Sequence, residues 1–112
     1  MNKKEQKLLQ NFPKHQDNLK EQLKNDSEYA QMWLDSLLED YSTTKDVNEL
    51  IYNLKPLIEA NYTICDFAKL IGINRITLYK IFSRKMIPSI EILHKIFAGL
   101  GYDLKISAQK AI

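Results

Sequence analysis

The sequence predicts a mainly α-helical fold: a single domain of five to seven helices followed by a short C-terminal β-strand. Apolar residues recur at three- and four-residue steps through most of the chain, as they do in amphipathic helices. After Gly101 they alternate with polar residues instead, which is typical of a strand. With 112 residues, of which 45% are apolar, the chain can enclose one core but not two.

The N-terminal part of the chain is expected to form a helical extension, and whether it is mobile stays open. A short helix over residues 3–12 would be interrupted by Pro13, because proline lacks the backbone N–H of a helix interior. A second short helix, from about residue 15 to residue 24, offers only Leu19 and Leu23 for burial.

A longer helix is predicted from the start signal Asn25-Asp26-Ser27 to about Tyr41. Its apolar positions mark a face toward the core: Ala30, Trp33, Leu34, Leu37, Leu38 and Tyr41. Residues 42–45 are expected to form a polar turn, after which Thr44 or Asp46 caps the next helix.

That next helix continues to about Ala60. Its buried side is expected to contain Val47, Leu50, Ile51, Leu54, Leu57 and Ile58. Pro56 lies inside it and removes one backbone hydrogen bond, so we expect a kink or a break there.

Residues 67–83, FAKLIGINRITLYKIFS, predict two short helices joined by a tight turn. Thr63 caps the first of these helices. Gly72 ends it, because glycine adopts the left-handed conformation of a helix end at almost no cost. Ile73 fills the turn, and Asn74 caps the second helix.

On a helical wheel the second helix of this motif has two distinct faces. The inward set is Leu78, Ile81 and Phe82, the opposite set is Ile76, Lys80 and Ser83, and the flanking set is Arg75, Thr77 and Tyr79. An outward face of this kind can be presented to the major groove of DNA. Ile76 supports that interpretation, because an apolar side chain on an outward face can contact a thymine methyl group.

The distribution of charge agrees with a nucleic-acid partner for the C-terminal half. The net charge of the whole chain is only +2, but residues 1–25 carry +3, residues 26–60 carry −6 and residues 61–112 carry +5. A basic segment that contains the two-helix motif suits a phosphate backbone. Two helices joined by a glycine turn also occur in bundles that bind no DNA, so a protein-interaction module that keeps the motif as a scaffold stays open.

A basic loop, residues 83–86, follows the motif, and Pro88 and Ser89 start a final helix. The inward residues of this helix are expected to be Ile90, Leu93, Ile96, Phe97 and Leu100, with Gly99 and Gly101 ending it.

The predicted strand carries Tyr102, Leu104 and Ile106 on one side. A lone strand needs a partner, and the simplest one is the same strand of a second copy, which would give a two-fold dimer. A loosely docked tail is the alternative. The expected organisation is an N-terminal helical extension over residues 1–25, a helix-turn-helix domain with a dimerisation strand over residues 26–107, and a tail over residues 108–112.

Catalytic and metal-binding roles are not expected. His15 and His94 lack the spacing of metal ligands, Cys65 has no base nearby, and three glycines cannot form a phosphate-binding loop. No cofactor is therefore predicted. The single cysteine, and the absence of a long apolar run or a signal peptide at the N-terminus, lead us to expect a cytoplasmic protein without a membrane partner.

Residues 26–106 resemble the HigA-like antitoxins of the addiction-module antidote family, which carry a lambda-repressor-like helix-turn-helix of the XRE type. The resemblance lies in Asp26-Ser27-Glu28-Tyr29-Ala30, in FAKLIGINRITLYKIFS with its Leu78-Tyr79-Lys80 segment, and in PSIEILHKIFAGLGYDLKIS. It implies a cytoplasmic antitoxin that neutralises a small RelE/ParE-like toxin and represses its own operon as a dimer. Ile76, Ile64 and Pro56 depart from the family pattern, so neither the operator sequence nor a contact by Ile64 is carried over.

The resulting hypothesis assigns DNA contacts to eight residues in and around the motif. Base edges of the operator would be contacted by Arg75, Ile76, Thr77 and Lys80, with Lys80 toward a guanine. Phosphates would be bound by Thr63, Asn74, Arg84 and Lys85. The toxin could bind the acidic surfaces between Asp26 and Glu59 or the N-terminal extension. A phage- or plasmid-type repressor without a toxin is the nearest alternative.

Overall fold

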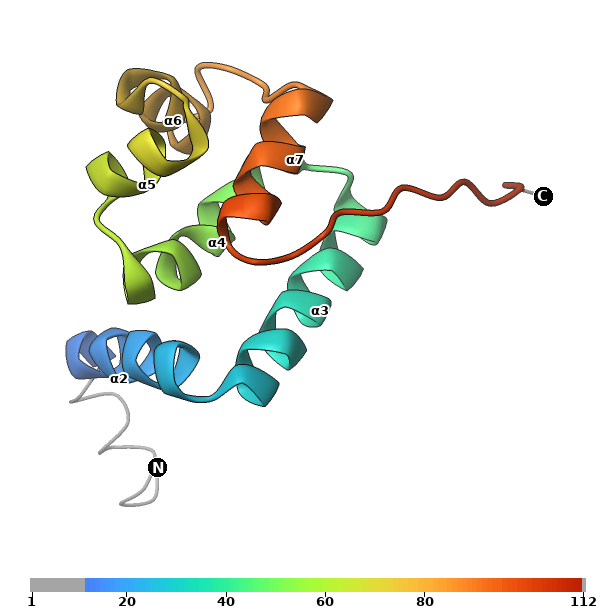
Figure 1. Cartoon of the computed structure of the whole chain (residues 1–112). Helices are drawn as coiled ribbons and strands as arrows, with labels where there is room; N and C mark the ends of the chain where they lie inside the picture. Colours follow the sequence, from blue (N-terminus) through green and yellow to red (C-terminus); the bar gives the residue numbers. More distant parts are fainter. Residues whose placement is uncertain (1–11, 112) are drawn as a thin grey trace.

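The computed structural model describes residues 12–111, and the ordered elements among them are six α-helices (Figure 1). They are α2 (Phe12–Asn25), α3 (Ser27–Thr44), α4 (Val47–Asn61), α5 (Ile64–Ile71), α6 (Arg75–Phe82) and α7 (Ile90–Gly99). The predicted mainly helical fold with its helix-turn-helix is therefore confirmed. The expected helix over residues 3–12 lies, up to residue 11, outside the described residues.

The predicted C-terminal β-strand is wrong for the single chain. Residues 12–111 contain no strand, and the segment after Gly101 is extended backbone that leads away from the helices (Figure 1). Tyr102 and Leu104 pack partly against the core, whereas Ile106 is 66% exposed. The physical reason is that alternation alone does not make a strand: the backbone groups need a neighbouring strand, and one copy of this part of the chain supplies none.

α4 is the centre of the fold, because it packs against α2, α3, α5 and α6. Ile51, Leu54 and Ile58 on α4 are completely buried. The predicted break at Pro56 does not occur, since α4 runs without interruption from Val47 to Asn61. Buried residues on both sides of Pro56 hold the helix together although one backbone hydrogen bond is missing.

The N-terminal helix α2 is longer than predicted and lies on α4. It begins at Phe12, so Pro13 stands in its first turn, where a backbone N–H would have no helical partner anyway. Leu23 is buried against the core, as expected, and Leu19 packs partly against it. An ion pair joins Lys20 Nζ to Glu59 Oε1 at 3.6 Å.

The C-terminal end of α3 differs from the sequence prediction. The expected polar turn over residues 42–45 is helical up to Thr44, where α3 ends, and the C-cap residue Lys45 adopts the left-handed conformation with φ of 57°. Its backbone N–H donates to the carbonyl oxygen of Tyr41 at 2.8 Å. Asp46 then caps α4, and its carboxylate accepts a hydrogen bond from the backbone N–H of Glu49 at 3.1 Å.

The bounds of α7 agree with the prediction, because Ser89 caps it and Gly99 is its last residue, but one of its predicted inward residues is exposed. Ile90 was expected to face inward but is 61% exposed, because it is the first residue of α7 and its neighbours Ser89 and Glu91 are exposed too. Gly99 is the last residue of α7, as expected, and Gly101, two residues later, has a positive φ of 90°. A Cβ atom on Gly99 would collide with Ile71 and would lie 3.0 Å from Phe67, so Gly99 is where α7 approaches α5 closely.

Candidate nucleic-acid interface

The helix-turn-helix consists of α5 and α6, which lie side by side at one end of the molecule, with α2 at the other end (Figure 1). Gly72 ends α5 in the left-handed conformation with φ of 73°, as predicted. The backbone N–H of Ile73 donates to the carbonyl oxygen of Ala68 at 2.9 Å, which closes the turn. This local geometry fixes the angle at which α6 leaves α5.

The two faces of α6 are those that the helical wheel predicts. Leu78 and Ile81 are completely buried and Phe82 is 9% exposed, so this side anchors the helix. The outward face of α6 consists of the exposed residues Arg75, Ile76, Tyr79 and Lys80. Ile76 is 57% exposed there. Thr77, at the edge of this face, is half-buried.

Both predicted caps of the motif are present. The Asn74 Oδ1 atom accepts a hydrogen bond from the backbone N–H of Ile76 at 2.8 Å. The Thr63 Oγ1 atom accepts one from the backbone N–H of Asp66 at 3.0 Å. The side-chain amide of Asn74 and the hydroxyl proton of Thr63 still have donor capacity, and donors are what a phosphate oxygen requires. Their proposed phosphate contacts are therefore chemically compatible with capping.

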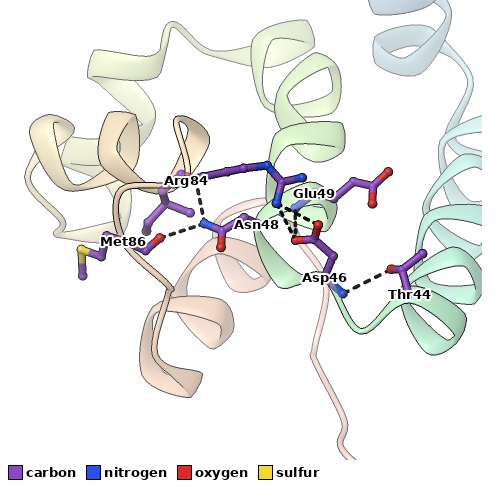
Figure 2. A network of polar contacts seen from close by, with 7 residues as sticks. Thr44, Asp46, Asn48, Glu49, Arg84 and Met86 are labelled. Carbon is purple, nitrogen blue, oxygen red and sulfur yellow. Dashed lines mark hydrogen bonds and ion pairs between the residues drawn. The ribbon is translucent and has the colours of Figure 1, made fainter.

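The end of α6 is held by a residue that the sequence analysis did not single out. Asn48, on the first turn of α4, is buried, and its Nδ2 atom donates to the carbonyl oxygens of Ile81 at 2.9 Å and Met86 at 2.8 Å (Figure 2). Lys55, also on α4, places its Nζ atom 5.4 Å from the centre of the Phe82 ring. α4 thus fixes both the last turn of α6 and the loop that follows. The sequence did contain a signal for Asn48: it is a polar residue at a position where the helical period of α4 places buried apolar residues.

Arg84, a predicted phosphate contact, is bonded to Asp46. Its Nη1 atom lies 2.8 Å from Oδ2 and 3.1 Å from Oδ1 of that carboxylate (Figure 2). The hydrogen bond from the Glu49 backbone N–H, and then the hydrogen bond from the Arg84 guanidinium, lower the pKa of Asp46 below its ordinary value of 3.8. Arg84 also has a positive φ, of 65°, which is uncommon for a residue with a side chain.

Basic side chains gather at the C-terminal end of α6. Lys80 and Lys85 are exposed, and the Lys85 backbone N–H donates to the Lys80 carbonyl oxygen at 2.8 Å. Positive charge at this end of a helix is favourable because the helix dipole is negative there. The structure therefore brings Lys80, Arg84 and Lys85 together, whereas Thr63 and Asn74 lie at the starts of α5 and α6.

Metal-binding clusters and membrane-spanning helices are absent from the described part of the chain. Residues 12–111 contain no group of three or more His, Cys, Asp or Glu side chains arranged to hold a metal ion. Among the same residues, no helix has both the length and the apolar character needed to cross a membrane.

Comparison with known families agrees with this geometry. The sequence model of a family described as helix-turn-helix matches residues 57–106, which include the end of α4, all of α5, α6 and α7, and the start of the segment after Gly101. The match supports a DNA-binding domain of the XRE type and a role in transcription regulation. No curated protein and no solved structure matches the chain.

Proposed function

We propose that this protein is a transcription regulator that places α6 in the major groove of double-stranded DNA. The observation that carries this proposal is that α6 has one buried and one exposed face. Leu78 and Ile81 are completely buried, while Ile76 and Lys80 are exposed. The buried side fixes the helix to the rest of the domain, so the outward face can be held rigidly against a groove. The family match over residues 57–106 supports the same function.

Within this proposal the contacts fall into two classes. Base edges are contacted by Arg75, Ile76, Thr77 and Lys80, with Lys80 toward a guanine and Ile76 toward a thymine methyl group. Phosphates are bound by Thr63, Asn74, Arg84 and Lys85, which surround the ends of α5 and α6. The first class determines sequence preference and the second contributes affinity for any duplex.

The experiment that tests DNA binding is a titration of a fluorescently labelled random-sequence duplex with the full chain at several salt concentrations. Fluorescence anisotropy of the duplex measures the binding. We expect affinity to fall steeply with salt, because each phosphate contact releases counterions. A chain that binds no duplex at low salt would overturn the proposal and favour the alternative in which the helix-turn-helix is only a scaffold for protein contacts.

We further propose that two copies of the chain act together on DNA through the segments that follow Gly101. In this segment Tyr102, Leu104 and Ile106 alternate with polar residues, and Ile106 is largely exposed. Pairing with the same segment of a second copy would satisfy the backbone groups of both segments and create the strand that the single chain lacks. Sedimentation tests this: Ile106→Pro should dissociate the dimer, whereas Ile106→Ala should not. A wild-type monomer would contradict the proposal.

We infer that the regulator is an antitoxin of a type II toxin–antitoxin system. The support is the resemblance of residues 26–106 to HigA-like antitoxins, together with α3, which carries four acidic and no basic residues. Trp33, Leu37 and Leu38 on α3 are only partly buried, so a basic toxin could meet both charge and apolar surface there.

Co-expression with the adjacent small reading frame and purification of the complex tests the antitoxin assignment. We expect the two proteins to copurify and the toxicity of the second to be neutralised. DNA binding without such a neighbour would favour the alternative, a phage- or plasmid-type repressor with no toxin partner.

A further inference from the structure

Arg84 and Asp46 are 38 residues apart in sequence and form a surface ion pair next to the end of α6 (Figure 2). The side chain of Arg84 is 58% exposed and that of Asp46 is 32% exposed, so a ligand can reach the pair. A guanidinium group recognises carboxylate and phosphate with the same planar arrangement of donors. We propose that the Asp46 carboxylate takes the place of a DNA phosphate in the free protein. It pairs with the Arg84 guanidinium until a phosphate of bound DNA displaces it.

The position of Arg84 is set by the backbone and not by the ion pair. Its backbone N–H donates to the Ile81 carbonyl oxygen at 3.2 Å, and the following residue, Lys85, donates to Lys80. Asn48 holds the loop from the other side through Met86. The loop therefore keeps its shape when the guanidinium group changes partner, and only the side chain of Arg84 has to move.

Asp46 keeps a hydrogen-bond partner when the Arg84 side chain moves away from it. Its Oδ1 atom accepts the hydrogen bond from the Glu49 backbone N–H that caps α4. An exposed ion pair contributes little stability, whereas a phosphate contact gains from counterion release. The exchange from carboxylate to phosphate therefore breaks no buried interaction. Its consequence is that Asp46 lowers the affinity for any duplex, because each binding event must first separate Arg84 from it.

The variant Asp46→Asn isolates this effect, because asparagine caps a helix as well as aspartate does but carries no charge. Asp26→Asn is the matched control. Asp26 caps α3 in the same way, by accepting from the Tyr29 backbone N–H at 3.0 Å, and it lies at the start of α3, away from α6 (Figure 1). Both variants change the net charge by the same amount.

The inference rests on the proposed DNA binding, and the experiment is the salt titration with the random-sequence duplex. We expect Asp46→Asn to bind about three- to fivefold more tightly than wild type at low salt, and its slope of log affinity against log salt to steepen by up to about one. Asp26→Asn should show only the smaller, general effect of charge. In a protein that already carries Arg84→Ala, the further change Asp46→Asn should raise the affinity for DNA only as much as Asp26→Asn does.

The pattern of results distinguishes a failure of this inference from a failure of the proposed function. Salt-dependent binding by wild type with equal effects of Asp46→Asn and Asp26→Asn would overturn the role of Asp46 and leave DNA binding intact. If Asp46→Asn still tightens binding more than Asp26→Asn does when Arg84 is replaced by alanine, the role of Asp46 is overturned as well. Absence of binding by wild type and both variants would overturn the two proposals together. Thermal unfolding of each variant verifies that the compared proteins are folded.

Discussion

Asn48 Nδ2 donates a hydrogen bond to the carbonyl oxygen of Ile81 at 2.9 Å, which connects the first turn of α4 to the last turn of α6. The same nitrogen reaches Met86 in the following loop. One buried side chain therefore satisfies two backbone acceptors of a segment that is more than thirty residues away. The orientation of the proposed DNA-reading helix depends on this contact as well as on its own apolar side.

Asn48→Ala should lower the free energy of unfolding by roughly 1–3 kcal/mol, because it removes two hydrogen bonds, of which the one to the Met86 carbonyl oxygen is not replaced by the Arg84 backbone N–H. Chemical denaturation measures the difference. Asn53→Ala, on the same helix but half-exposed, is the control and should change stability by less than about 0.5 kcal/mol. Equal small effects of both substitutions would show that water replaces the Asn48 amide.

Gly99→Ala should destabilise the protein by roughly 1–3 kcal/mol, because the new methyl group collides with Ile71 and crowds Phe67. Helix propensity alone predicts the opposite sign, a gain of about 1 kcal/mol from replacing glycine by alanine inside a helix. Thermal unfolding decides between the two effects. A higher midpoint temperature for Gly99→Ala would mean that α5 and α7 can separate easily.

Ile76→Ala should relax the preference for one base pair without affecting stability, since its side chain is 57% exposed. Selection of binding sites from a random-sequence pool, carried out with each variant, gives the preference at every position. Ile87→Ala is the control, because Ile87 is 73% exposed but lies in the loop after α6. Identical selected sites for wild type and Ile76→Ala would remove Ile76 from the base contacts.

Lys85→Ala should weaken binding to all duplexes alike and reduce the salt slope by about one, as expected for the loss of one phosphate contact. Lys24→Ala removes the same charge from α2, at the other end of the molecule (Figure 1), and should leave the slope unchanged. If both variants change the slope equally, the effect is one of total charge and Lys85 is not a specific contact.

Acid should remove the stability that the Asp46 carboxylate provides. The folded pKa of Asp46 lies below 3.8, so its contribution is complete above that pH and is lost as the pH falls through the folded value. The difference in stability between wild type and Asp46→Asn should therefore be constant near neutral pH and shrink below about pH 4. Denaturation at several pH values measures it. A difference that does not change with pH would contradict the lowered pKa.

Local features of the site were predictable from the sequence. The faces of α6, the caps at Thr63 and Asn74 and the left-handed Gly72 all depend on residues within a few positions of one another. Periodicity and capping preferences describe interactions of that range. The sequence therefore predicted the outward position of Ile76 correctly.

Contacts between distant segments were not predictable. The pairing of Arg84 with Asp46 depends on how α4 meets the loop after α6, and periodicity carries no information about that approach. The same holds for Gly99, because its close contact with Ile71 forms only when α5 and α7 pack together. The strand prediction failed for a related reason, since alternation at Tyr102 and Leu104 says nothing about where a pairing partner would come from.

The central place of α4 has a consequence for how the protein opens. Because α2, α3, α5 and α6 all rest on this helix, each of them loses part of its packing once α4 has melted. The chain should therefore lose its structure in a single cooperative step, and the amides around Ile51, Leu54 and Ile58 should exchange with deuterium only through that global event. A regulator built in this way has no half-folded form in which α6 survives alone.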